Sequence, residues 1–421
     1  MSLIVRRSEL HGTVRVPASK SHTIRAVFIA SLAEGESDIL QPLDSLDTMA
    51  AVNACRGFGA EITLGEKWTV RGTAGALRVP DDVIDVANSG TSLYITMSTA
   101  ALCGGYSVLT GDDQIRKRPA QPLIESLNDL GAEVVSTRAN GMPPLVVKGL
   151  LRGGTTSIRC PTSQYLTSLL INAPLAESST KIDVLELNEH PYVEMTLGWL
   201  DSQGIAYSRA GFERFEIEGG QSYSAFTREM PADFSSATFF LVAAAITGSD
   251  LTLEGLDMTD AQGDKAVVGM LDEMGARVTV TENAVRIEGK PLQGAEFDLN
   301  ATPDALPAMA VAGCFAEGVT KLANVPQARL KETDRIAVMR EELTRMGGRI
   351  EELPDGLVVT GGGLTGANVR GHDDHRVVMA LAVAGLAAGG TTEIDSAEST
   401  RVTFPNFVEL MREVGSQIEE V

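Results

Sequence analysis

A short pattern that recurs six times along the chain constrains its fold more than any other feature. In every copy a helical segment ends at a glycine, and a short run of strand-forming residues follows. Successive glycines are separated by 72, 73, 71, 72 and 68 residues, and they are Gly59, Gly131, Gly204, Gly275, Gly347 and Gly415. Such regular spacing indicates an internal repeat. We predict that each glycine ends its helix by adopting the left-handed conformation.

Each repeat is expected to contain about two helices and several strands. Residues 122–130 illustrate the helical part, because apolar side chains recur there on one face. Turn residues such as Asn140 and Gly141 separate apolar runs, as β-hairpins require. Six units of this length divide naturally into two lobes of three, which is a usual size for domains. We therefore expect a mixed α/β (α+β) fold of two similar lobes, with the active site in the cleft between them.

The composition narrows the function classes. The 421-residue chain exceeds what one hydrophobic core usually supports, and its net charge of −21 argues against nucleic acid or an anionic membrane as partner. A cytoplasmic location is expected, because the N-terminal segment lacks a signal-peptide pattern and the most apolar stretch, residues 377–388, is too short for a membrane span. The four cysteines lie far apart without CxxC spacing, which suggests neither a disulfide framework nor a zinc site.

Against this acidic background, short polar motifs that contain Lys or Arg indicate a site for a small anion. Lys20, Ser21 and Arg25 precede an apolar helix expected over residues 26–32, where backbone N–H groups attract anions. The polar loop at residues 88–92 opens a second apolar helix in the same way. For each motif alone, an ordinary helix cap or a solvated charge is the alternative.

Four further motifs follow along the chain, at residues 116–119, 161–165, 329–335 and 373–376. In the third of these, Lys331 and Arg335 stand four residues apart and would share one helix face. Asp304 opens another helix of small residues. No Walker A, Rossmann or HExxH pattern competes with these motifs.

Taken together, the motifs resemble, in order and over essentially the whole chain, those of the EPSP synthase family. The resemblance implies transfer of the enolpyruvyl group of phosphoenolpyruvate (PEP) to a hydroxyl of shikimate-3-phosphate with release of phosphate, in the shikimate pathway of aromatic amino acid biosynthesis. It implies a monomer with an inside-out α/β barrel type of lobe. Residues 18–226 would form the N-terminal lobe, and residues 227–421, completed by an N-terminal strand within residues 1–17, the C-terminal lobe. We expect no metal and no cofactor.

The resemblance also assigns roles to residues of this chain. Asp304 would take the proton of the acceptor hydroxyl, and Glu332 or Lys20 would protonate the PEP methylene. The acceptor would meet Lys20, Ser21, Arg25, Thr162, Ser163, Gln164, Asp304, Gln327 and Lys331. PEP would be surrounded by Lys20, Gly90, Arg118, Gln164, Arg335 and Arg376.

Three positions depart from the family pattern. Tyr94 replaces a usual Arg, Glu189 replaces a serine that contacts the acceptor phosphate, and Val402 replaces a PEP-binding Lys. Arg401 would point away from that site if this segment is a strand. The alternatives are therefore a homologue that acts on a different or unphosphorylated alcohol, or a weakly catalytic anion-binding paralogue. The sister family that uses UDP-N-acetylglucosamine fits less well, because its loop cysteine has no counterpart near residues 116–119.

Overall fold

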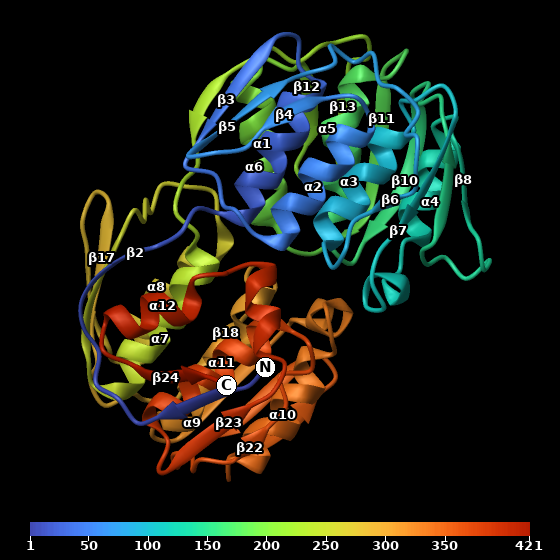
Figure 1. The fold of residues 1–421 in the computed structure, drawn as a ribbon. Helices are drawn as coiled ribbons and strands as arrows, with labels where there is room; N and C mark the ends of the chain where they lie inside the picture. The colour runs from blue at the N-terminus through green and yellow to red at the C-terminus, as the bar shows by residue number, and fades with distance from the viewer. The chain divides into compact units, whose positions relative to one another are not determined.

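The computed structural model describes all 421 residues, and they fall into two compact units. Unit 1 comprises Met1–Pro17 and Pro231–Val421, and unit 2 comprises Ala18–Met230. The lobe boundary expected after residue 226 lies slightly before the one that the contacts define. The prediction of a mixed α/β fold is confirmed (Figure 1). None of the helices combines the length and the apolar character that a membrane span needs.

Three four-stranded sheets in unit 2 share one topology. In each, the first two strands in spatial order are parallel and the remaining pairs are antiparallel. The first sheet has the order β14 (Thr227–Glu229), β3 (Glu36–Leu40), β5 (Lys67–Arg71) and β4 (Glu61–Thr63). The second has β6 (Ile84–Asp85), β7 (Tyr106–Thr110), β9 (Leu145–Lys148) and β8 (Glu133–Ser136). The third has β10 (Gly154–Cys160), β11 (Thr180–Leu187), β13 (Arg214–Ile217) and β12 (Tyr207–Ala210).

Unit 1 repeats the same topology three times. Its first sheet has the order β2 (His11–Arg15), β15 (Asp250–Glu254), β17 (Ala284–Glu288) and β16 (Arg277–Val280). The second has β18 (Glu296–Asp298), β19 (Val319–Ala323), β21 (Gly356–Thr360) and β20 (Arg349–Leu353). The third has β22 (Asn368–Val369), β23 (Thr391–Ile394), β1 (Leu3–Arg6) and β24 (Gln417–Glu420). Strands β1 and β2 therefore complete sheets whose other strands lie far along the chain.

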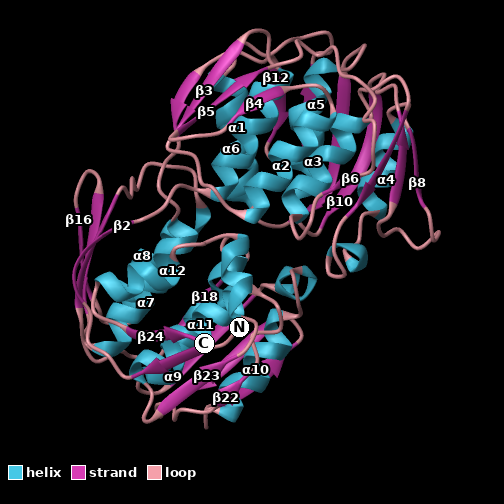
Figure 2. Cartoon of the chain, viewed as in Figure 1, coloured by secondary structure: helices cyan, strands magenta, loops and turns pink.

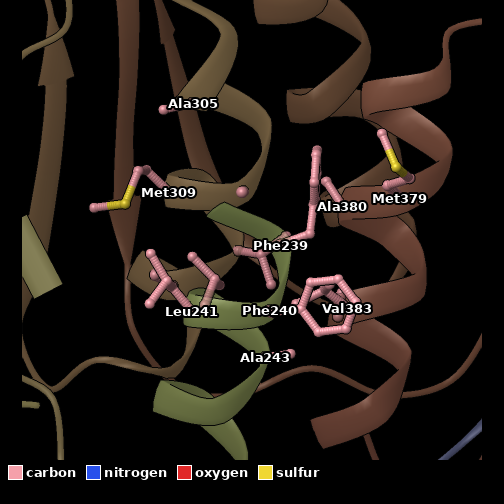
Figure 3. Packing of buried hydrophobic residues seen from close by; sticks show 14 of the residues in the cluster. Phe239, Phe240, Leu241, Ala243, Ala305, Met309, Met379, Ala380 and Val383 are labelled. Atoms are coloured by element: carbon pink, nitrogen blue, oxygen red, sulfur yellow. The ribbon is translucent and has the colours of Figure 1, made fainter. Parts of the chain in front are cut away.

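The first helix of each repeat is buried almost all round. In unit 2 these helices are α1 (Lys20–Leu32), α3 (Gly90–Ala100) and α5 (Gln164–Asn172), and in unit 1 they are α7 (Phe234–Thr247), α9 (Leu306–Phe315) and α11 (His375–Ala387). Figure 2 shows the sheets of each unit at the periphery of its helices. In Figure 3, side chains of α7, α9 and α11, among them Phe239, Phe240, Met309 and Val383, meet in the core of unit 1.

The second helix of each repeat ends at one of the repeat glycines. These helices are α2 (Leu46–Gly57), α4 (Gln121–Asp129), α6 (His190–Ser202), α8 (Ala266–Glu273), α10 (Arg335–Arg345) and α12 (Phe407–Glu413). All six repeat glycines have positive φ, from 68° at Gly204 to 109° at Gly59. The predicted left-handed helix ends are therefore confirmed, and a side chain at these positions would cost about 1 to 2 kcal/mol.

Short 3-10 helices connect several of these elements. They are η1 (Ile115–Lys117), η2 (Ala173–Leu175), η3 (Gly263–Lys265), η4 (Pro303–Ala305), η5 (Pro326–Leu330) and η6 (Ala397–Val402). The segment around Arg401 is not the strand that was considered, because Arg401 lies in the 3-10 helix η6. Its side chain is exposed, while that of Val402 is buried.

Candidate active site

The three buried helices of unit 2 begin with uncharged caps. Ser19 caps α1 by accepting a hydrogen bond from the His22 amide, and Ser89 caps α3 by accepting one from the Ser92 amide. None of α1, α3 and α5 carries an acidic residue in its first turn. The positive ends of these helices are therefore not offset by carboxylates of their own first turns, which suits an anionic ligand at α1 and α3, whereas at α5 the Glu189 side chain takes this place.

The predicted start of the first of these helices is wrong by about one and a half turns. The sequence places Lys20 and Ser21 ahead of a helix over residues 26–32, whereas α1 already begins at Lys20. The reason is the cap, because the Ser19 side chain satisfies an amide of the first turn and allows the helix to start there. Lys20, Ser21 and Arg25 consequently lie on the helix itself.

Lys20 is held by a carboxylate that sequence reasoning missed. Its Nζ lies 3.0 Å from Asp47 Oδ2, and the two side chains are 16% and 4% exposed. Asp47 stands in the first turn of α2, where Ser45 and Thr48 form a capping box. That box is readable in the sequence and could have placed Asp47 at a helix start.

Arg25 is buried and ties three helices together. Its guanidinium donates to the hydroxyls of Thr196 and Thr167 and to the carbonyls of Ser21 and Tyr192, at distances of 3.0 to 3.2 Å. Burial lowers the pKa of Arg25 to about 10. The structure thus gives this residue a role in the scaffold, and its contact with an acceptor stays a prediction.

Thr162 and Ser163 meet at the carboxylate of Glu189. Oε2 of Glu189 accepts hydrogen bonds from the Ser163 amide at 3.0 Å, the Ser163 hydroxyl at 2.8 Å and the Thr162 hydroxyl at 3.1 Å. Glu189 is only 1% exposed. Glu189, which departs from the family pattern, therefore accepts hydrogen bonds from two residues that are predicted to bind the acceptor.

Three of the predicted PEP residues converge at the start of α3. A Cβ atom added to Gly90 would lie 3.0 Å from Arg118 Nη1 and 3.3 Å from Gln164 Oε1. Oε1 of Gln164 is buried and has no hydrogen-bond partner. The glycine therefore allows the guanidinium and the amide to approach the helix terminus closely.

Tyr94, the second departure, packs behind this group. Its hydroxyl donates to the carbonyl of Pro119 at 2.8 Å, and the hydroxyl of Tyr165 donates to the same carbonyl at 2.6 Å. The two rings pack edge to face with their centroids 4.8 Å apart. The two hydroxyls hold the Pro119 carbonyl in place, directly after Arg118. Tyr94 therefore supports the backbone beside Arg118, whereas the family pattern expected at position 94 is a cationic Arg.

A single buried guanidinium organises the predicted site residues of unit 1. Arg335 is 1% exposed, and it donates to Asp304 Oδ1 at 2.8 Å, to Asp374 Oδ2 at 2.8 Å and to Glu332 Oε2. Burial alone would lower the pKa of Arg335, but the carboxylates of Asp374, Glu332 and Asp304 raise it above its usual value. Both acid/base candidates of the sequence therefore share one cation.

Asp304 has further cations around it. Arg376 Nη2 lies 3.1 Å from Asp304 Oδ2, and Lys331 Nζ lies 4.0 Å from Asp304 Oδ1. Together with Arg335, three cations stabilise negative charge on this carboxylate. The predicted helix face shared by Lys331 and Arg335 is wrong, because η5 ends at Leu330 and Asp334 caps a new helix that begins at Arg335.

Asp374 is a second carboxylate that was not among the predicted site residues. It is fully buried, caps α11 by accepting from the amides of Arg376 and Val377, and binds Arg335. Ligand atoms of Glu332, Asp374 and His375 lie within 4.8 Å of one another, a spacing that a metal ion could use. Arg335 donates to both carboxylates of that group and already supplies a positive charge there.

Gln327 is the remaining predicted acceptor residue of unit 1. It is 1% exposed and lies in η5, where its Nε2 donates to the carbonyl of Asn300 at 2.9 Å. Its Oε1 is buried without a partner. One end of the amide is thus anchored, and the other has an unused acceptor.

Comparison with known proteins adds evidence from the chain as a whole. The family model described as EPSP synthase (3-phosphoshikimate 1-carboxyvinyltransferase) matches residues 4–411. Relatives named 3-phosphoshikimate 1-carboxyvinyltransferase include those of Ruminiclostridium cellulolyticum, 54% identical over 100% of both chains, and of Acetivibrio thermocellus, 56% identical over 99% of both. The structure of EPSP synthase from Acinetobacter baumannii is similar with a TM-score of 0.83 and 28% identity over 99% of both chains.

The enolpyruvyl transferase NikO from Streptomyces tendae shares the fold, with a TM-score of 0.80 at 21% identity over 100% of this chain and 98% of that one. Six equivalent repeats in two units, with arginines gathered around carboxylates, are thus the framework of a carboxyvinyl-transferring enzyme. Within that class, the chain belongs to the EPSP synthase family.

Proposed function

We propose that this protein transfers the enolpyruvyl group of PEP to a hydroxyl of shikimate-3-phosphate and releases inorganic phosphate. Family membership supports this function, and the observation that carries it is the cluster in which Arg335 holds Asp304 and Glu332 together. This cluster combines carboxylates for proton transfer with guanidinium groups for an anionic substrate.

The reaction needs two proton transfers. The acceptor hydroxyl loses a proton while the PEP methylene gains one, and the resulting tetrahedral ketal then expels phosphate. We assign the first transfer to Asp304, whose negative charge is stabilised by Arg335 and Arg376. Each positioned proton transfer contributes roughly 10² to 10⁴ in rate.

Two candidates remain for the proton donor, and they differ in their contacts. Lys20 is an ammonium paired with Asp47, so it already carries a proton. Glu332 is paired with Arg335 and must take up a proton before it can donate one. Negative charges of PEP bound near Arg335 would compete for its N–H groups and so free Glu332 for protonation. We therefore propose Lys20 or Glu332 as the proton donor.

The anionic groups of PEP are assigned to two sets of residues. The set in unit 2 is Arg118 and Gln164, which converge at Gly90. The set in unit 1 is Arg335 and Arg376, which both form salt bridges with Asp304. Planar guanidinium groups bind carboxylate and phosphate oxygens in pairs, and they offset the charge that develops on the leaving phosphate.

A different acceptor is the second candidate function, and the contacts of Glu189 favour it. A carboxylate already accepts the hydrogen bonds of Thr162 and Ser163, which the first proposal gives to the acceptor. An acceptor without a phosphate would not need those donors.

The experiment follows phosphate release from PEP with shikimate-3-phosphate, shikimate or no acceptor. We expect release that depends on shikimate-3-phosphate, and a loss of turnover of roughly 10² or more in Asp304→Asn with little change in acceptor binding. Asp272→Asn removes the same charge from the exposed face of α8 and should behave like the parent. Absence of acceptor-dependent release with every acceptor would refute the proposed function.

A further inference from the structure

The contacts of Glu189 have the form of a bound anion. One oxygen, Oε2, accepts from a backbone amide and two hydroxyls, all of which lie at the start of α5. Ser163 is the N-cap residue of α5, but its hydroxyl bonds to Glu189 rather than to an amide of its own helix. Amides and hydroxyls at a helix start are the donors that proteins use for small anions. Here a side chain of the same chain takes them.

The backbone around Glu189 holds the carboxylate in this position. Glu189 caps α6 in the left-handed conformation with φ of 62°, which is uncommon for a residue other than glycine. The start of α6 is tied to α1 by Arg25, which donates to the Tyr192 carbonyl and to the Thr196 hydroxyl. The carboxylate is therefore buried, and the backbone that carries it is fixed by its neighbours.

The donors that bind Glu189 are too few for two anions. Each hydroxyl has one hydrogen to donate, and the Ser163 amide has one. A phosphate that used the same three groups would stand within a few ångströms of the carboxylate, and like charges at that distance repel strongly. The two anions must therefore compete for these donors.

We propose that Glu189 is a specificity-determining residue that acts as an internal competitor of the acceptor's anionic group. This inference rests on the proposed function, because it takes Thr162 and Ser163 as acceptor-binding residues. The carboxylate must leave the three donors before a phosphorylated acceptor can use them. It weakens binding of shikimate-3-phosphate, and it lowers the preference of the enzyme for that acceptor over unphosphorylated shikimate.

The test removes the negative charge of the Glu189 side chain. Glu189→Gln retains an oxygen acceptor of the same length, and Glu189→Asn is a second variant because asparagine tolerates the left-handed backbone. In both variants we expect KM for shikimate-3-phosphate to fall about tenfold, because a like-charge contact is removed. KM for PEP should be unchanged, and the ratio of kcat/KM for shikimate-3-phosphate to that for shikimate should rise about tenfold.

Glu186→Gln is the matched control. Glu186 lies three residues earlier, is exposed and is paired only loosely with Arg159 at 3.4 Å. Its removal changes the net charge equally but should leave both KM values and the acceptor ratio as in the parent. Thermal unfolding of all variants verifies that they are folded.

The outcomes separate the inference from the proposed function. If the parent shows no turnover with either acceptor, the proposed function fails. If the parent is active and both folded Glu189 variants keep its acceptor ratio, or bind shikimate-3-phosphate more weakly, Glu189 is no competitor and the inference alone is overturned. If one Glu189 variant no longer unfolds cooperatively, the kinetics of the other variant alone decide the outcome. Unfolding of both would assign Glu189 to the scaffold and also overturn the inference.

Discussion

At the scale of single residues, Gly90 lies where two predicted PEP-binding side chains approach the start of α3 closely. Gly90→Ala would place a methyl group 3.0 Å from Arg118 Nη1 and 3.3 Å from Gln164 Oε1, so both side chains would have to shift. Because both are proposed to bind PEP, we predict a KM for PEP about tenfold higher, with a smaller effect on the acceptor. Steady-state kinetics checks this. Gly198→Ala is the control, because nothing lies within 4 Å of an added Cβ on that exposed helical residue.

The buried cysteines predict how stability depends on pH. Burial raises the pKa of Cys55, Cys103 and Cys314 to about 12 from an ordinary value of 9.0, and it also raises that of Cys160. In the unfolded chain these thiols ionise near pH 9, whereas the folded chain keeps them protonated. The free energy of unfolding that the buried thiols contribute is therefore fully present below pH 9, and this contribution is lost as the pH rises from about 9 to 12.

Two measurements check this prediction. The midpoint of urea unfolding should fall steadily from pH 8.5 to 10.5, and a thiol reagent at pH 8 should modify the four cysteines slowly in the folded protein and rapidly in urea. Rapid modification of the folded protein would show that at least one thiol is accessible and ionised. A variant with Cys160→Ala should lose less stability over the same pH range.

At the scale of elements, the loop between β22 and α11 has a strained backbone and leads directly into Asp374, the N-cap of α11, and Arg376 in its first turn. His372 and Asp373 both have φ of 53°. Glu342 of α10, which is fully buried, accepts from the Arg370 amide at 3.1 Å and contacts His372 Nε2 at 2.8 Å. This carboxylate therefore anchors the loop that positions two groups of the candidate site.

We predict that Glu342→Gln weakens this anchor and moves Arg376. The expected results are a loss of about 1 to 3 kcal/mol in the free energy of unfolding and a higher KM for PEP. The neighbouring Glu341 pairs with Arg345 on the surface at 2.7 Å, so Glu341→Gln removes the same charge without touching the loop. If both variants unfold and bind PEP alike, Glu342 does not position the loop.

The elements also show where sequence reasoning succeeds. The repeat glycines could be predicted because a left-handed helix end depends on one residue and its local geometry, as Gly59 and Gly131 show. The start of α1 and the break between Lys331 and Arg335 depend on caps, and Ser19 and Asp334 decide them through single hydrogen bonds that periodicity does not reveal. Local patterns therefore predicted which elements exist better than where they begin.

The contacts of the candidate site are less predictable, since its partners lie far apart in sequence. The three carboxylates on Arg335 come from residues 304, 332 and 374, and only the fold brings them together. Asp374 was readable as a helix cap but not as a partner of Arg335. Likewise, Glu189 was recognised as a departure, but its three hydrogen bonds were not.

At the scale of the whole molecule, one repeat is assembled from both ends of the chain. In the sixth sheet, β1 lies between β23 and β24, so that Val5 faces Thr392 on one side and Ile418 on the other. In the other five sheets, the strand at the corresponding place is the next one along the chain after the strand that follows the repeat glycine, as β5 comes after β4. The regular spacing predicts six repeats, but it does not show that the N-terminal strand completes the last one.

We propose that this repeat architecture carries enolpyruvyl transfer from PEP to shikimate-3-phosphate. Phosphorus NMR of the parent enzyme with both compounds tests it most directly, because the two phosphates have separate resonances. We predict that the PEP resonance disappears, that one equivalent of inorganic phosphate appears, and that the acceptor phosphate persists as a new ester species. Inorganic phosphate without a new ester species, or an unchanged spectrum, would contradict the account.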